Sequence, residues 1–338
     1  VIPFMIHRSV PGIGPWVLPA YVFAAVPALI AALAYAILAS AMPRAGGSYV
    51  YVSRALHPYL GFVASFSQWV GLSIAIGVVS YVLIPFLRDI ATAVGQVGLA
   101  TTLETGIVRV SLALAFLWTF VWVNLHGLKL YKNMLVPMMF LMFALGSVVI
   151  IAGFAFDHEQ FVVAVQAADN HAIPEGGEFP FRLGIFLAAA AVLFSSFIGF
   201  DSIAQAGGEA RNPHLSLPLA IGIAVVTVGT FYLLFTSAVY HAVPWRFVAE
   251  EALTQDLTAP GLLGYLLPTG WTVAIIAGAA VALINDLPAM LLVVSRLMFA
   301  WAEDGIFPRF VGSVHPTRHT PGVAIVLSGL MASAGILG

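Results

Sequence analysis

The chain has 338 residues, of which 61% are hydrophobic and 8% are charged, and its formal net charge is −2. A soluble domain carries roughly 25% charged residues, so this composition excludes a water-facing surface and makes lipid the solvent for most of the exterior. The small net charge gives no reason to expect nucleic-acid binding. The lack of cysteine excludes disulfides and iron–sulfur ligation. The apolar runs are continuous, whereas barrel strands alternate, so we expect an all-α integral membrane protein.

Apolar stretches recur along the chain, each close to the ~20 residues that a membrane-spanning helix needs. They fall near residues 15–42, 59–87, 109–126, 133–156, 183–205, 215–240, 271–300 and 321–338, and the first few residues look like the end of one further helix. Because the sequence begins and ends inside apolar segments, we expect a fragment that is incomplete at both ends.

The loops between these stretches alternate in charge. One set holds most of the basic residues, and the positive-inside rule places it in the cytoplasm. These residues are Arg44, Arg54, Lys129, Lys132, Arg211, Arg296, Arg309 and Arg318. The other set holds most of the carboxylates, so the loops near 155–181 and 241–268 are predicted to be external.

The segment from Phe194 to Pro213 places a carboxylate, Asp201, inside an apolar stretch. An ionisable residue at membrane depth is costly and usually faces a cavity or a partner. Gly199 beside Phe200 would let the helix unwind, which exposes carbonyls for an ammonium group and amides for a carboxylate. The alternative is a plain helix with one glycine and an aspartate near its cytoplasmic end.

The stretch 271–300 contains a second carboxylate. Asp286 follows Asn285 and precedes Arg296 by ten residues, or roughly 15 Å along a helix, which places it well inside the bilayer. The functional interpretation is a proton or cation site, and the alternative is a helix-to-helix hydrogen bond inside the bundle.

The two glycine-rich cytoplasmic segments could form a gate. Residues 42–58 contain Arg44 with a Gly46-Gly47 pair that permits a tight backbone path, and residues 207–221 contain Glu209 and Arg211. Ordinary solvated loops are the alternative for both segments. The histidines lie in loops or at helix ends, and HExxH, P-loop and GxSxG motifs are absent, so we expect neither an enzyme nor a cofactor.

Four segments together resemble the amino acid–polyamine–organocation permeases, in order and at the expected spacing. They are PRAGGSYVYVSRALHP, VNLHGLK, FIGFDSIAQAGGEARNPHLSLPLAI and SRLMFAWAEDGIFPRFVGSVHPTRHTP. The resemblance implies a LeuT-like fold of two inverted five-helix repeats in one transporter domain, residues 1–338. Residues 1–156 would supply helices 1b to 5 of the first repeat, and residues 183–338 would supply helices 6 to 9 of the second.

The family binds the amino and carboxylate groups of its substrate at the broken middles of helices 1 and 6. Carried over to this chain, the part from helix 6 is Phe197, Ile198 and Gly199, with Phe200 and Asp201 beside it. The part from helix 1 would lie just before Val1.

Some proton-coupled members resembling this chain carry a lysine in helix 5, and the corresponding position here falls at about Met142, which does not titrate. The coupling position in helix 8 of sodium-coupled relatives falls at Asp286. We therefore hypothesise that Asp286, next to Asn285, supplies the coupling charge.

The expected function is alternating-access transport of an amino acid or related amine across the cell membrane, within lipid, coupled to protons or operating by exchange, with sodium as a further possibility. Three alternatives stay open at this point: an antiporter for polyamines or other cations with the same fold, an amino-acid sensor that does not transport, and a channel.

Overall fold

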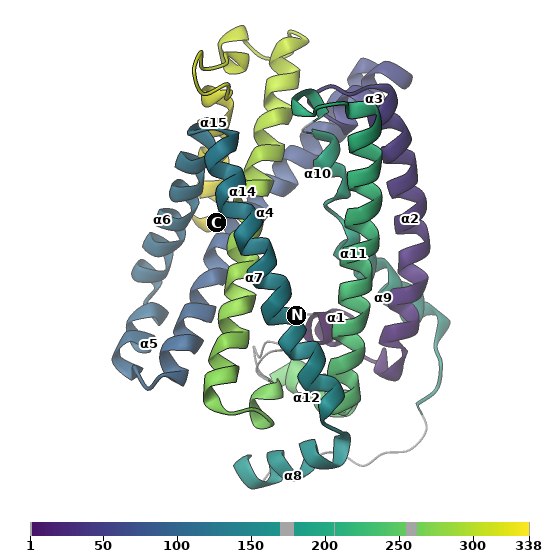
Figure 1. The fold of residues 1–338 in the computed structure, drawn as a ribbon, viewed down its shortest axis with the longest axis vertical. Helices are drawn as coiled ribbons and strands as arrows, with labels where there is room; N and C mark the ends of the chain where they lie inside the picture. The colour runs from purple at the N-terminus through teal and green to yellow at the C-terminus, as the bar shows by residue number, and fades with distance from the viewer. Residues whose placement is uncertain (1, 170–178, 206, 255–261, 338) are drawn as a thin grey trace. The chain divides into compact units, whose positions relative to one another are not determined.

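The computed structural model describes residues 2–169, 179–205, 207–254 and 262–337 (Figure 1). Within these ranges, the regular structure consists of α-helices and short 3₁₀-helices, without strands. Seven helical segments in the described part of the chain are long and apolar enough to cross a membrane. The prediction of an all-α integral membrane protein is confirmed.

The helices follow the predicted apolar stretches, with short helices between them. In chain order they are α1 (Ile2–Ser9), η1 (Gly14–Trp16), α2 (Val17–Ala41), α3 (Ser48–Ala55), α4 (Pro58–Ala93), α5 (Val97–Glu104), α6 (Gly106–Leu125), α7 (Leu128–Ala155), α8 (His158–Asp169), α9 (Leu183–Phe194), η2 (Ser195–Phe197), α10 (Phe200–Gln205), η3 (Gly207–Glu209), α11 (Pro213–Ala242), α12 (Trp245–Thr254), η4 (Leu263–Tyr265), α14 (Thr269–Glu303), η5 (Arg309–Gly312) and α15 (Gly322–Leu337). The short helices α3, α5, α8 and α12 lie where the sequence suggested only loops.

The chain forms two compact units, each assembled from separate stretches of sequence. Unit 1 contains Val1–Ala31, Phe143–Ile198 and Ala224–Ala279, and unit 2 contains Ala32–Met142, Gly199–Ile223 and Ala280–Gly338. Each unit draws on both predicted repeats, so the packing units are not the repeats themselves. The division of the chain into inverted repeats remains a prediction.

The core of unit 1 joins short helices to the long ones. Phe161 of α8 and Phe247 of α12 are fully buried, with ring centroids 5.1 Å apart. Phe4 of α1 and Val239 of α11 belong to the same hydrophobic cluster. Burying an aromatic side chain contributes about 1.5–3 kcal/mol, so these rings hold α1, α8, α11 and α12 together.

The core of unit 2 forms where α4, α6 and α15 pack side by side, with α5 next to α4 and α6 (Figure 1). Ile76, Leu117, Leu291 and Ile325 are buried there together. A separate buried group around Trp301, whose indole nitrogen donates a hydrogen bond to the Ser65 hydroxyl at 2.9 Å, ties the end of α14 to α4. This packing fixes the C-terminal end of α14, which carries charged residues described below.

Candidate functional site

The helix predicted over residues 183–205 is interrupted. The α-helix α9 ends at Phe194 and continues as the 3₁₀-turn η2, after which Ile198 adopts an extended backbone with φ −63° and ψ 138°. Gly199 follows with φ +130°, a conformation that L side chains rarely adopt, and α10 begins at Phe200. The end of one helix and the start of the next each leave backbone groups without intrahelical partners. The predicted interruption is therefore present at Ile198–Gly199, which is also where the chain passes from unit 1 to unit 2.

Aromatic residues fix the chain on each side of the interruption. In unit 1, the Phe197 ring stacks on Tyr21 with centroids 5.0 Å apart. In unit 2, the Phe200 ring meets Tyr35 edge-on at 5.5 Å. Both phenylalanines are buried, whereas the Ile198 side chain is 61% exposed. Because the two rings are anchored, the two residues between them carry the change in backbone direction.

Both oxygens of the Asp201 carboxylate accept hydrogen bonds. The Gly199 amide donates to Oδ1 at 3.2 Å, and the Gln68 side-chain amide donates to Oδ2 at 2.6 Å. A carboxylate in the first turn of a helix is favoured by the partial positive charge there. In this structure Asp201 thus stabilises the start of α10, and its part in substrate binding remains a prediction.

Asp286 lies in the continuous helix α14, and its side chain is exposed. Among the described residues, none forms a hydrogen bond or ion pair with its carboxylate. The neighbouring Asn285 has a buried Oδ1 atom that also lacks a hydrogen-bond donor. Within the described ranges, Asp286 therefore does not form the helix-to-helix hydrogen bond that was the alternative to a proton or cation site. The structure does not bring Asp286 into contact with Asp201 within these ranges, although both belong to unit 2.

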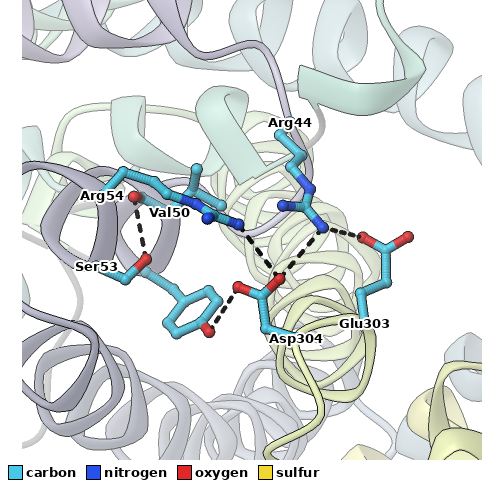
Figure 2. A network of polar contacts seen from close by, with 7 residues as sticks. Arg44, Val50, Ser53, Arg54, Glu303 and Asp304 are labelled. Carbon is cyan, nitrogen blue, oxygen red and sulfur yellow. Dashed lines mark hydrogen bonds and ion pairs between the residues drawn. The ribbon is translucent and has the colours of Figure 1, made fainter.

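Arg44 takes part in a cluster of charges at the end of α14 (Figure 2). Its Nη2 atom lies 3.2 Å from Glu303 Oε2 and 3.3 Å from Asp304 Oδ1. Arg54 reaches the same Asp304 oxygen at 3.4 Å, and the Tyr49 hydroxyl donates to Asp304 Oδ2 at 2.8 Å. Burial and the contact with Asp304 raise the pKa of Tyr49 to about 12, so the phenol keeps its proton at physiological pH.

Of the other predicted gate residues, Arg211 does not join this cluster among the described residues. The Glu209 side chain lies outside the described residues, and the Arg211 side chain is exposed. The carboxylates opposite Arg44 are instead Glu303 and Asp304, which sequence reasoning did not single out. The sequence does contain a sign of these carboxylates. They are the two adjacent acidic residues of the run AEDG, which directly follows Trp301 in one of the segments that carry the family resemblance.

The Gly46-Gly47 pair is required by close packing. A Cβ on Gly46 would lie 2.6 Å from Ala300 Cβ, and one on Gly47 would lie 2.9 Å from Gln205 Cδ. Both glycines have positive φ, +105° and +38°. Since contacts of this length do not occur with a real Cβ, only glycine lets the loop after α2 press against α10 and α14.

The sequence profile of the amino acid permease family matches residues 3–338. The chain belongs to this family. The family expected from the four segments is thereby confirmed. With seven apolar helices long enough to cross a bilayer in the described ranges, the permease is a multi-pass membrane protein, and the bacterial relatives below support placing it in the cell membrane.

Several characterised proteins are similar to this permease over most of its length. Cationic amino acid transporter 4 of Mus musculus is 27% identical over 96% of this chain and 50% of its own length. The branched-chain amino acid permease BcaP of Bacillus subtilis is 27% identical over 95% of this chain and 67% of its own length. The low-affinity putrescine importer PlaP of Escherichia coli is 25% identical, over 94% and 66%. The chain spans about half the length of cationic amino acid transporter 4 of Mus musculus and of Homo sapiens.

Proposed function

We propose that this permease is a secondary transporter that carries an amino acid or a related amine across the membrane by alternating access. The single observation that carries the proposal is the interrupted helix at Ile198–Gly199 in a chain that belongs to the amino acid permease family. Broken helices at membrane depth present free amides and carbonyls to a small polar ligand, and secondary transporters bind substrates there.

The interruption has the chemistry to bind a zwitterion. The start of α10 favours negative charge, and a substrate carboxylate would take the place that the Asp201 carboxylate now holds on the Gly199 amide. The carbonyls at the end of η2 suit an ammonium group. Gly199 adds no side chain, and a Cβ built on it would meet no atom within 4 Å. The backbone groups that the interruption leaves without helical partners support assigning Phe197, Ile198, Gly199, Phe200 and Asp201 to the substrate site.

The substrate class is an amino acid or an amine, and the relatives define the compounds to test. Their names cover cationic amino acids, branched-chain amino acids and putrescine, so they do not agree on a side chain. Both Asp201 oxygens accept hydrogen bonds from neutral amides, and these contacts leave its charge uncompensated, so they do not decide between a basic and a neutral substrate side chain. An arginine or lysine, a leucine and putrescine therefore form the minimal panel.

Coupling is assigned to Asp286, with Asn285 beside it. A carboxylate at membrane depth without a partner among the described residues is costly unless it binds a proton or a cation. The Asn285 Oδ1, buried and without a hydrogen-bond donor among the described residues, is a second uncompensated oxygen on the same turn of α14. We infer proton coupling first, with exchange and sodium coupling as the outcomes that an ion-dependence measurement would distinguish.

The cluster around Asp304 is assigned to a cytoplasmic gate. It joins the loop after α2 to the end of α14 through Arg44, and α3 to the same carboxylate through Arg54 and Tyr49. Partly exposed ion pairs are each worth about 0.2–1 kcal/mol. Interactions this weak can form and break in each transport cycle.

The test is uptake and counterflow by the full-length protein in liposomes. A carrier preloaded with unlabelled substrate accumulates labelled substrate transiently, and the uptake saturates and is competed by analogues. A channel would show flux that does not saturate and no counterflow. A sensor would bind the substrate, seen as a rise in melting temperature, without flux.

A further inference from the structure

A chain of polar contacts leads from the interruption to the loop after α2, all of it within unit 2. Asp201 Oδ2 accepts a hydrogen bond from Gln68 Nε2 at 2.6 Å, and Gln68 Oε1 accepts one from the Ser48 hydroxyl at 3.2 Å. The Ser48 hydroxyl also shares a hydrogen bond of 3.0 Å with Tyr35. These four side chains come from α10, α4, α3 and α2, so one line of contacts ties four helices together.

The amide of Gln68 is the central member of this chain. It donates to the aspartate and accepts from the serine, and Gln205 Nε2 approaches the same Gln68 oxygen at 3.5 Å. Gln205 is completely buried and lies against Gly47, the residue before Ser48. Replacing Gln68 would leave a carboxylate and a hydroxyl at membrane depth each short of a partner, which is costly.

A second link runs parallel to the hydrogen bonds. Tyr35, whose hydroxyl ends the polar chain, also packs its ring edge-on against Phe200, the first residue of α10. The start of α10 is therefore held by Gln68 through Asp201 and by Tyr35 through Phe200. Since α3 directly follows the Gly46-Gly47 turn, a movement of that loop would carry Ser48 away from Gln68.

We propose that Gln68 is a positioning residue for the substrate site. Its side-chain amide holds the Asp201 carboxylate on the Gly199 amide. Through Ser48 and Tyr35, the same side chain links this arrangement to the cytoplasmic loop after α2. The proposal rests on the proposed function for its link to transport. Its physical core, that Gln68 fixes the backbone at the interruption, stands on the contacts alone. When the loop after α2 moves, Gln68 loses the Ser48 donor, its amide is free to turn, and the Asp201 carboxylate is released from the break.

The sharpest test exchanges donor and acceptor between the two partners. In the Gln68→Glu variant two carboxylates face each other, and we expect uptake at neutral pH to fall about tenfold or more, with partial recovery in acid, where a shared proton restores one donor. In the double variant Gln68→Glu/Asp201→Asn, the amide and the carboxylate have changed places and every hydrogen bond can form again. We expect the exchange to remove the acid dependence that Gln68→Glu introduces, as for interactions that couple strongly in a double-mutant cycle.

Two further variants complete the set. Gln68→Leu keeps the size but removes both polar functions, and we expect a loss that Asp201→Asn does not repair. Gln96→Leu is the matched control, since Gln96 is exposed at the start of α5 without a side-chain capping bond. The control should keep the parent KM.

A readout independent of transport separates this proposal from the proposed function. The 338 residues contain no cysteine, so a single Ile198→Cys substitution can report the break by its rate of maleimide labelling, once any cysteine elsewhere in the full-length protein is removed. We expect faster labelling with Gln68→Leu and Gln68→Glu, and the parent rate in the exchanged double variant. Parent labelling rates in all variants, or a faster labelling of Gln68→Glu that Asp201→Asn leaves unchanged, would overturn the role of Gln68. Absence of transport by the parent protein, with the labelling pattern as expected, would refute only the carrier function.

Discussion

Gly199 offers the most direct perturbation of the interrupted helix. Its φ of +130° lies where L side chains rarely occur, while the space around it is open. The Gly199→Ala variant therefore tests backbone conformation with no steric clash to confuse the result. Holding a non-glycine residue in such a conformation costs about 1–3 kcal/mol. The variant must either bear this cost or adopt a more helical backbone that withdraws the freed amides and carbonyls.

Bearing the cost lowers the stability of the folded protein. Adopting a more helical backbone weakens substrate binding, because the strained conformation must be restored when the substrate binds, and we expect this second response. A penalty of about 1–3 kcal/mol corresponds to a factor of about 5 to 150 in an equilibrium constant. We expect KM to rise within this range, measured as initial uptake of each panel substrate into liposomes, with a smaller rise in melting temperature on adding substrate.

The matched control is Gly222→Ala. Gly222 lies in the exposed face of α11, a Cβ added to it would also meet open space, and it does not have a positive φ. Alanine in a helix interior is favoured over glycine by roughly 0.5–1 kcal/mol, so this variant should be at least as stable as the parent and equally active. Equal KM values for the Gly199→Ala and Gly222→Ala variants would refute the reasoning.

Three further outcomes are expected. Asp304→Asn weakens the contacts to Arg44, Arg54 and Tyr49 together, and we expect a clear change in uptake rate. The control Arg211→Gln, at an exposed position, should behave as the parent. Equal effects of the two substitutions on the uptake rate would exclude the gate. The pKa of Tyr49 is raised from 10.0 to about 12, so its contribution to stability is complete below pH 10 and is lost as the pH rises toward 12. The melting temperatures of the parent and of Tyr49→Phe should therefore differ at neutral pH and converge in alkali. A difference that stays constant with pH would contradict this expectation. Asp286→Asn should abolish the dependence of uptake on pH or sodium. Glu159 is an exposed carboxylate in α8, and the control Glu159→Gln should leave this dependence unchanged. Full ion dependence in the Asp286→Asn variant would show that Asp286 is not part of the coupling site.

Local chemistry made the interruption predictable. A glycine between bulky apolar residues, followed closely by a carboxylate, is an expensive combination in lipid unless the helix breaks there, and the break lies at Ile198–Gly199. The apolar spans were predictable for the same reason, because their length is set by the bilayer. The glycine pair at 46–47 was readable as a tight turn, although the atoms that demand it were not.

Partners distant in sequence could not be predicted. Gln68 meets Asp201 from 133 positions away, and nothing in the local pattern of α4 marks that glutamine. The carboxylates opposite Arg44 are likewise 259 and 260 positions away. The local pattern singled out Glu209 and Arg211 but not the end of α14, which tertiary packing brings to Arg44. The short helices between spans were missed because they lack a long apolar period, and their stability comes from packing.

The most direct test of the central claim is an experimental structure of the full-length protein with a transported substrate bound. We expect density for the substrate beside Ile198 and Gly199, with its ammonium and carboxylate groups on the freed backbone carbonyls and amides. An unbroken helix through Gly199, or a substrate bound away from these residues, would contradict the proposed site.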